Sequence, residues 1–286
     1  MTTAVLNGIL IGGVYALLAL GLVMIYGVMR IVNLSHGPLV ALAGYITFSI
    51  CSLLKVDPLI LLPLIGVLFY GLGILVYKFL LKPVIFKPRI ITLILTMGLG
   101  YIIQSLILIV WGADYRSILT PYSSRSIIVA GIPVSFIRVI LFLLAFFTIA
   151  LMYIILNRTK MGKVMLACSQ SLEGAKIVGI NVDKVFEFTN GISFAIIGVA
   201  GAMVAMIIVL YPTVGDLFTL KSFCINVLGG LGSVIGIPLG GIILGLVESI
   251  SSVFLPVMWN NGVAFLVLVL VLLVRPTGIF GRPENL

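Results

Sequence analysis

Long apolar segments separated by short polar ones dominate this sequence. Each apolar segment is near or above the roughly 20 residues that an α-helix needs to cross a bilayer. The alternation typical of transmembrane β-strands is missing, so backbone hydrogen bonds must be satisfied within helices. The pattern predicts an all-α, polytopic membrane protein of about eight to nine transmembrane helices, in one transmembrane domain over residues 1–286. The charge-free stretches are 1–29, 31–54, 58–77, 90–113, 139–157, 188–215, 222–247 and 249–274.

Two interruptions within the apolar segments contain residues that helices tolerate poorly. The first runs from Asn33 to Pro38, and the second from Gly229 to Pro238. The stretch 218–255 around the second is short for two full crossings, so we expect two short or half-crossing helices there. Non-helical backbone survives at membrane depth only where protein buries it or where it faces a watery cavity. Both breaks are therefore expected to line a translocation route or to pack beside it.

Glycine recurs at four-residue spacing near the second break. This spacing places small residues on one face of a helix, where they allow a neighbouring helix to approach closely. We expect packing rather than ligand binding from these glycines, which are Gly232, Gly236, Gly240, Gly241 and Gly245.

The composition excludes water-soluble and nucleic-acid-binding proteins. Apolar residues make up 62% of the chain and charged residues only 9%, against roughly a quarter charged in soluble domains. The net charge of +9 follows from the positive-inside rule, because Lys and Arg near the ends of spans stay in the cytoplasm. The rule places 158–187 and the C-terminus inside, and the N-terminus, 112–136 and 255–261 outside. Five of the 17 Lys and Arg residues then lie outside, namely Lys55, Arg116, Arg125, Arg138 and Lys221.

Residues 158–187 are the one long polar segment. Ser169 or Ser171 can cap a helix whose first turn contains Glu173, and Gly179 can end it. The spacing predicts a surface helix of about two to three turns at the cytoplasmic face. An ordinary solvated loop is the alternative.

Motifs along the chain give it two specific resemblances. The segment SLEGAKIVGINV at 171–182 resembles the E-A-A-x-x-x-G loop by which ABC importer permeases dock on their ATPases. The whole chain resembles a high-affinity branched-chain amino acid ABC transporter permease, in NGILIGGVYALLALGLVMIYGVMRIVNLSHG at 7–37, TMGLG at 96–100, VLGGLGSVIGIPLGG at 227–241 and RPTGIFGRP at 275–283. One position departs from the family pattern, because Pro38 stands where relatives usually carry Asp or Glu.

The resemblance implies a permease subunit in the bacterial inner membrane that moves branched-chain or related small amino acids. It implies four kinds of partner: two ATP-binding cassette subunits, a homologous second permease, an extracytoplasmic solute-binding protein and the lipid bilayer. It assigns ATPase coupling to 158–187, with Ser171, Glu173, Gly174, Ala175, Lys176, Gly179 and Asn181 as the coupling residues.

Polar residues near the breaks are candidates for the translocation pathway, and each has a structural alternative. Asn33 and Ser35 can bond to a passing zwitterion or cap the next helix. His36 can relay protons, or its ring can satisfy freed backbone groups at the turn. Glu248 lies within an apolar run, where a carboxylate is a functional candidate by default. Alternatively, it lies near the outer interface, or it pairs with Lys221 or with the neighbourhood of Asp216 as a structural tie. Asn226 completes the candidates.

Motifs for other functions are missing from the sequence. It contains no G-x-x-x-x-G-K-[ST] nucleotide-binding loop, no paired histidines and no carboxylate cluster. We therefore expect no enzymatic activity, cofactor, metal or nucleic acid partner. An ion-gradient-driven secondary transporter is the alternative function, although Glu248 is the one intramembrane carboxylate available to it.

Overall fold

The structure is a computed structural model that describes residues 1–118, 120, 122–123, 125–129, 131–256, 259–275 and 278. Within this part of the chain, seven helices are long and apolar enough to cross a membrane. They are α1 (Thr2–Met29), α2 (His36–Leu54), α3 (Pro58–Val76, continued by the π-helical turn η1, Tyr77–Leu81), α4 (Arg89–Trp111), α5 (Phe136–Arg158), α8 (Val182–Val204) and α10 (Ile237–Phe254). This confirms the predicted polytopic all-α fold.

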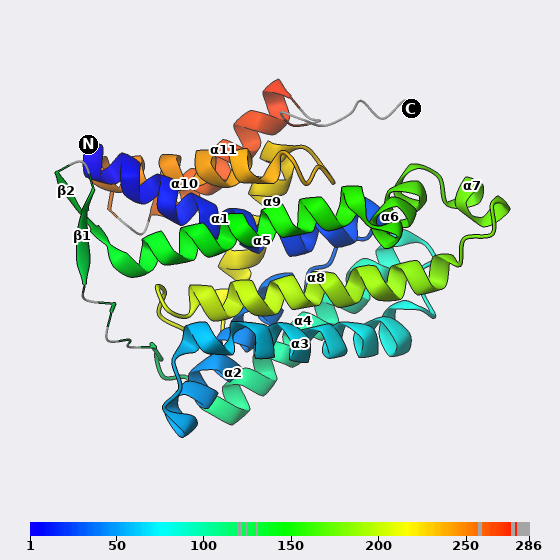
Figure 1. The fold of residues 1–286 in the computed structure, drawn as a ribbon, viewed down its shortest axis with the longest axis horizontal. Helices are drawn as coiled ribbons and strands as arrows, with labels where there is room; N and C mark the ends of the chain where they lie inside the picture. Colours follow the sequence, from blue (N-terminus) through cyan, green and yellow to red (C-terminus); the bar gives the residue numbers. More distant parts are fainter. Residues whose placement is uncertain are drawn as a thin grey trace.

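Shorter elements complete the fold. Two shorter helices, α9 (Val214–Gly229) and α11 (Asn260–Val274), also belong to the bundle, and α11 is apolar over Gly262–Val274. Surface helices α6 (Lys160–Gln170) and α7 (Leu172–Ile177) lie at one end of the bundle, and an antiparallel hairpin of β1 (Ser126–Val129) and β2 (Ile132–Ser135) lies at the other (Figure 1). The hairpin is joined directly to α5.

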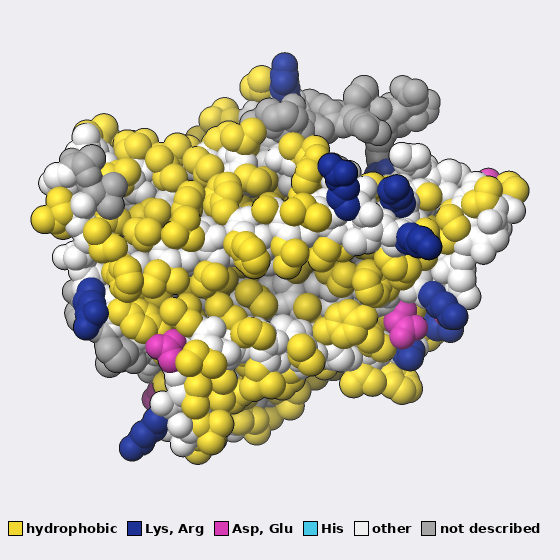
Figure 2. Space-filling model, in the orientation of Figure 1, with side chains coloured by type: hydrophobic (Ala, Val, Ile, Leu, Met, Phe, Trp, Pro, Cys, Tyr) yellow, Lys and Arg dark blue, Asp and Glu magenta, His cyan; other side chains and the backbone are white. Residues whose placement is uncertain are grey.

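Helix α1 forms the centre of the bundle. It packs against α10, α8, α5 and α9, and most of its residues from Gly8 to Met29 are buried. Its sequence is apolar on every side, which is the pattern of a helix surrounded by protein. Helices α4 and α5, by contrast, are mostly outside the core: only 22% and 28% of their apolar windows are buried. The face that Figure 2 shows is apolar over its middle, where α5 runs in Figure 1.

Glycines set the contact between α1 and α10. Gly8 and Gly12 of α1 face Gly241 and Gly245 of α10, and a Cβ added to Gly12 would lie 2.7 Å from the Gly241 carbonyl oxygen. Because no side chain stands between them, the two backbones approach closely, as in small-xxx-small packing. Gly240 approaches the Ile225 carbonyl oxygen of α9 in the same way. The packing role predicted from glycine spacing is therefore confirmed for these residues.

The connecting segments lie in two groups, one at each end of the bundle, and polar contacts hold each group in place. At one end the Tyr122 hydroxyl donates to Asp57 Oδ1 at 2.6 Å, and Arg138 donates to Asn7 at 2.9 Å. Burial raises the pKa of Tyr122, and the bond to Asp57 raises it further, so Tyr122 stays the donor at neutral pH.

At the other end of the bundle, Arg30 Nη2 donates to the Ser169 carbonyl oxygen at 3.5 Å. Lys and Arg side chains gather at this end, near α6 and α7 (Figure 2). The grouping agrees with the charge count, while the assignment of this end to the cytoplasm stays a prediction.

The two short helices expected around 218–255 are α9, with 16 residues, and α10, with 18. Two other predictions need correction. The charge-free stretch 188–215 does not coincide with a helix, since α8 runs from Val182 to Val204. Lys221 is not a loop residue outside the membrane: it lies in the middle of α9 inside the bundle. A charge count assigns such a residue to a loop because it cannot detect a buried partner.

The glycine contact predicts an effect on stability. We expect Gly12→Ala to destabilise the protein by about 1–3 kcal/mol, because the added methyl overlaps the α10 backbone. Gly71→Ala in α3 is the matched control, since nothing lies within 4 Å of its Cβ position, and alanine favours a helix over glycine by up to about 1 kcal/mol. Thermal unfolding in detergent measures both. Equal midpoints for the two variants would contradict the close approach.

Candidate functional site

The first break is a turn closed by its own polar side chains. Helix α1 ends at Arg30, whose left-handed φ of 56° turns the chain out of the helix. Asn33 Oδ1 then accepts from the Ser35 backbone N–H at 3.0 Å and from Ser35 Oγ at 2.6 Å. Both residues are buried. Asn33 and Ser35 thus bond to each other within the turn before α2. Ser35 is the N-cap residue of α2, but its side chain makes no cap hydrogen bond to the helix.

The residues after this turn pack against α9. His36 is fully buried, and its Nε2 lies 3.1 Å from Ser222 Oγ. The Gly37 backbone N–H donates to Thr219 Oγ1 at 3.0 Å. Gly37 also meets Gly215 with no room for a side chain on either residue. Thr219 of α9 thus satisfies the Gly37 N–H, and Thr96 of α4 accepts from the Leu34 N–H at 3.2 Å. The His36 ring contacts the Ser222 side chain instead of the backbone groups freed at the turn.

The second break, at the other end of α9, is held by a similar contact. Asn226 is buried, and its Oδ1 accepts from the Gly232 backbone N–H at 3.2 Å. Gly232 has a φ of 79°, which side-chain-bearing residues rarely adopt. Gly236 approaches the Gly229 backbone so closely that an added Cβ would overlap it. Asn226 thus orients the connection between α9 and α10.

Glu248 forms a buried ion pair. Its Oε2 lies 2.9 Å from Lys221 Nζ and accepts from the Tyr15 hydroxyl at 3.0 Å, while Lys221 Nζ also lies 2.7 Å from the Tyr15 hydroxyl oxygen. The side chains of Lys221 and Glu248 are only 11% and 8% exposed. The cluster ties α1, α9 and α10 together, as the structural alternative expected. Sequence reasoning missed Tyr15, because a tyrosine in an apolar helix gives no signal of its distant partners.

A groove lies where the first break, α4 and α9 meet. Its volume is about 380 Å³, within the roughly 300–1,000 Å³ of small-molecule pockets. Apolar side chains form most of its lining, and Gln104 Nε2 donates to Asp216 Oδ1 at 2.7 Å on its polar side. Its described lining residues are Leu34, Pro38, Met97, Gly100, Tyr101, Gln104, Asp216, Thr219, Leu220 and Phe223.

The predicted pathway residues do not line this groove. Its lining takes Leu34 and Pro38 from the first break, whereas Asn33, Ser35 and His36 are buried beside them. Asn226 and Glu248 are also buried and bonded within the bundle. A direct role for these five residues in the pathway stays a prediction. Sequence reasoning missed Gln104, since a glutamine within a span is notable only once its neighbour is known.

The segment expected to couple to an ATPase contains two short helices. Ser171 Oγ accepts from the Gly174 N–H at 3.0 Å and caps α7. Gly179, with a φ of 80°, ends it: the Gly179 N–H donates to the Lys176 carbonyl, and the Ile180 N–H to the Ala175 carbonyl, both at 3.0 Å. These paired bonds form a Schellman cap. The six residues of α7 are fewer than the predicted two to three turns, and α6 was not predicted.

The remaining coupling residues divide into exposed and buried ones. Glu173 and Lys176 are exposed, whereas Ala175 is buried and anchors α7. Lys176 Nζ lies 4.8 Å from the centre of the Phe86 ring. Beyond Lys176, Ile177 is 84% exposed at the tip of the segment.

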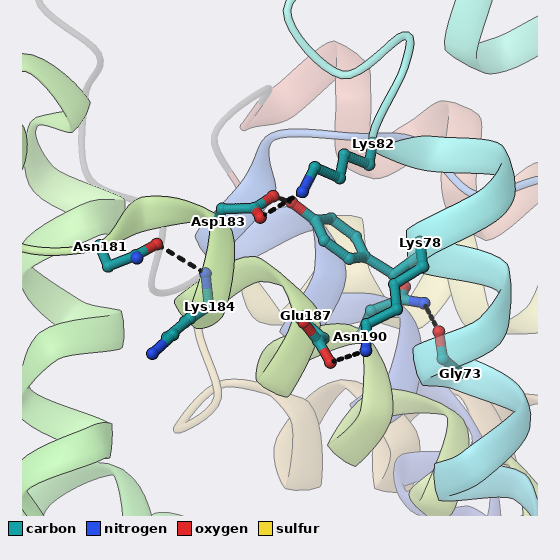
Figure 3. A network of polar contacts seen from close by, with 9 residues as sticks. Gly73, Lys78, Lys82, Asn181, Asp183, Lys184, Glu187 and Asn190 are labelled. Carbon is teal, nitrogen blue, oxygen red and sulfur yellow. Dashed lines mark hydrogen bonds and ion pairs between the residues drawn. The ribbon is translucent and has the colours of Figure 1, made fainter.

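A polar network anchors the segment to α3 (Figure 3). Asn181 Oδ1 accepts from the Lys184 N–H at 3.1 Å and caps α8, the helix that follows. The first turn of α8 then contacts the end of α3. Asp183 accepts from the hydroxyl of Tyr77, in the π-helical turn, and from Nζ of Lys82, the next residue after that turn, both at 2.7 Å. Lys78 and Glu187 add an ion pair at 3.1 Å. The start of α8, which follows α7 closely in the chain, is therefore bound to the end of α3.

Metal binding has no visible basis in the described residues. No three His, Cys, Asp or Glu side chains among them gather in an arrangement that could hold a metal ion.

Comparisons with known proteins agree with one another. The sequence matches the family model for the branched-chain amino acid transport system permease component over residues 4–272. The high-affinity branched-chain amino acid transport system permease protein LivH of Escherichia coli K12 is 32% identical, with 97% of this chain and 94% of the relative covered. BraD of Pseudomonas aeruginosa, which has the same description, is 30% identical over 97% and 95%. A probable branched-chain amino acid permease of Methanocaldococcus jannaschii is 28% identical over 96% and 91%. No solved structure matches the chain.

These matches extend over almost the whole chain and over almost the whole length of each relative. They confirm the resemblance that the four motifs indicated, and they give no support to an ion-driven secondary transporter. The chain therefore belongs to the branched-chain amino acid transport system permease family, and it is a multi-pass membrane transport component rather than an enzyme.

Proposed function

We propose that this chain is the membrane-spanning permease subunit of an ABC importer for branched-chain or related small amino acids in the bacterial inner membrane. The observation that carries the proposal is the family match over residues 4–272. The fold supports it, because the bundle combines an apolar outer surface with a groove of about 380 Å³ at a chain break. The groove offers mainly apolar walls, which suit aliphatic side chains.

The partners follow from two surfaces of the chain. We infer that 158–187 docks on one of two ATP-binding cassette subunits through α7 and the exposed Ile177. The groove is open along one side of the bundle, where Tyr101 is 58% exposed. A homologous second permease facing this side closes the route. An extracytoplasmic binding protein delivers the solute at the opposite end from α7.

The transport proposal is tested by reconstituting the complete transporter in liposomes. We expect uptake of leucine, isoleucine or valine that requires both ATP and the binding protein. The control is the same complex with a partner ATPase that cannot hydrolyse ATP. Uptake that persists with this control and follows an imposed ion gradient would contradict the proposal.

Coupling depends on the left-handed backbone at Gly179. We expect Gly179→Val to lower uptake and binding-protein-stimulated ATP hydrolysis together, because a β-branched residue at a φ of 80° costs at least roughly 1–2 kcal/mol. Gly179→Asn is the matched control, since asparagine tolerates this conformation, and it keeps most of the coupling. Glu173→Lys should also reduce coupling by reversing an exposed charge at the docking surface. Unchanged coupling in Gly179→Val and Glu173→Lys would remove α7 from the interface.

Sidedness is tested by single-cysteine labelling in a chain without Cys51, Cys168 and Cys224. Ile177→Cys on α7 and Ser126→Cys on the β-hairpin introduce exposed thiols at opposite ends. An impermeant thiol reagent should label position 126 from outside and position 177 only after the membrane is opened. The reverse pattern would overturn the topology.

A further inference from the structure

The groove between α4 and α9 contains a carboxylate, Asp216, in the first turn of α9. Gln104 of α4 donates to its Oδ1 at 2.7 Å and so fixes the orientation of the carboxylate. Asp216 is exposed on the surface of the single chain. A carboxylate has acceptor capacity for several donors, so one bond to an amide leaves room for a second, cationic partner.

Asp216 lies well inside the end of a helix long enough to span the membrane. Its partner Gln104 lies seven residues before Trp111, the last residue of α4, which corresponds to about 10 Å along the helix axis. A carboxylate at this level of a spanning helix is expected to face a watery cavity or another protein group. The groove supplies such a cavity.

The charge of the groove is negative. Asp216 is the one charged side chain among its described lining residues. Lys221 belongs to the same helix but is paired with Glu248 and Tyr15 inside the bundle. A solute in the groove thus meets one carboxylate next to the apolar side chains of Leu34, Met97, Leu220 and Phe223.

We propose that Asp216 binds the α-ammonium group of the amino acid in transit, while the apolar lining accommodates the aliphatic side chain. This inference rests on the proposed transport function and deepens it, because it identifies the chemical group that the permease itself recognises. A zwitterion with an aliphatic side chain fits the groove, whereas an anion of the same size is repelled. Gln104 is the positioning residue, since it orients the carboxylate without carrying charge.

The first experiment measures the charge preference of the groove without transport. Leu220→Cys is introduced into the cysteine-free chain of the assembled transporter, and labelling rates are compared for a cationic and an anionic methanethiosulfonate of similar size. We expect the cationic reagent to be favoured, and Asp216→Asn to lower the cationic-to-anionic rate ratio about tenfold, as expected for loss of one nearby charge. Ile128→Cys on the outer hairpin, 75% exposed, is the control whose ratio does not change.

The second experiment measures leucine uptake by the complete transporter. Asp216→Asn should reduce uptake about tenfold, with binding-protein-stimulated ATP hydrolysis within about twofold of the wild type, while Asp216→Glu retains most of the uptake. Asp114→Asn is the matched control, because this carboxylate is 81% exposed in the outer loop beside Arg116.

Several results would overturn the inference. They are wild-type uptake in Asp216→Asn, an unchanged labelling ratio, or a thiol at position 220 that no reagent reaches in any nucleotide state. Dissociation of the two permeases in Asp216→Asn would also overturn it, since the carboxylate would then serve subunit contact. Failure of the proposed function is distinct: the wild-type transporter would then take up no branched-chain amino acid, whatever the Asp216 variants show.

Discussion

Where a helix is interrupted inside a bilayer, its backbone N–H and C=O groups have no water to bind. The need to satisfy these groups governs how the bundle is arranged around α9. Each chain break frees N–H and C=O groups that cost several kcal/mol if left unsatisfied. Thr219, Ser222 and Asn226 of α9 bond to residues of the two breaks. A helix too short to span the membrane by itself is thus the element through which both irregular segments become tolerable.

Small residues make that arrangement geometrically possible. The first break reaches α9 only because Gly37 and Gly215 leave no side chain between the backbones, and α10 reaches α1 through Gly12 and Gly241. The ion pair of Lys221 and Glu248, with Tyr15, adds specific polar contacts between α1, α9 and α10 to this packing. Buried ion pairs contribute little net stability but penalise any arrangement that separates them. The cluster therefore fixes the rotation of α9 between α1 and α10.

Local patterns in the sequence predicted much of the fold, because hydropathy, glycine spacing and helix caps are local properties. The second break, the cap at Ser171 and the end at Gly179 lie where the residues indicated. The first break is shifted towards the N-terminus: it spans residues 30–35, and α2 begins at His36, within the predicted break. Contacts between distant residues were not predictable in the same way. Gln104 and Asp216 are separated by 112 residues, and nothing near either one indicates the other. Polarity near a break indicates a pathway position for Asn33, Ser35, His36 and Asn226, yet all four side chains are buried within the bundle.

The burial of α1 has a consequence for how the protein is made. Tyr15 enters the membrane with the first helix, but its partner Glu248 lies 233 residues later in the chain. At a synthesis rate of about 5–20 residues per second, that interval is roughly 10–50 s. During this time the centre of the future bundle is surrounded by lipid or by the insertion machinery. Helix α1 is apolar on every side, so it is stable in lipid during this interval. In the folded protein the same surface is buried.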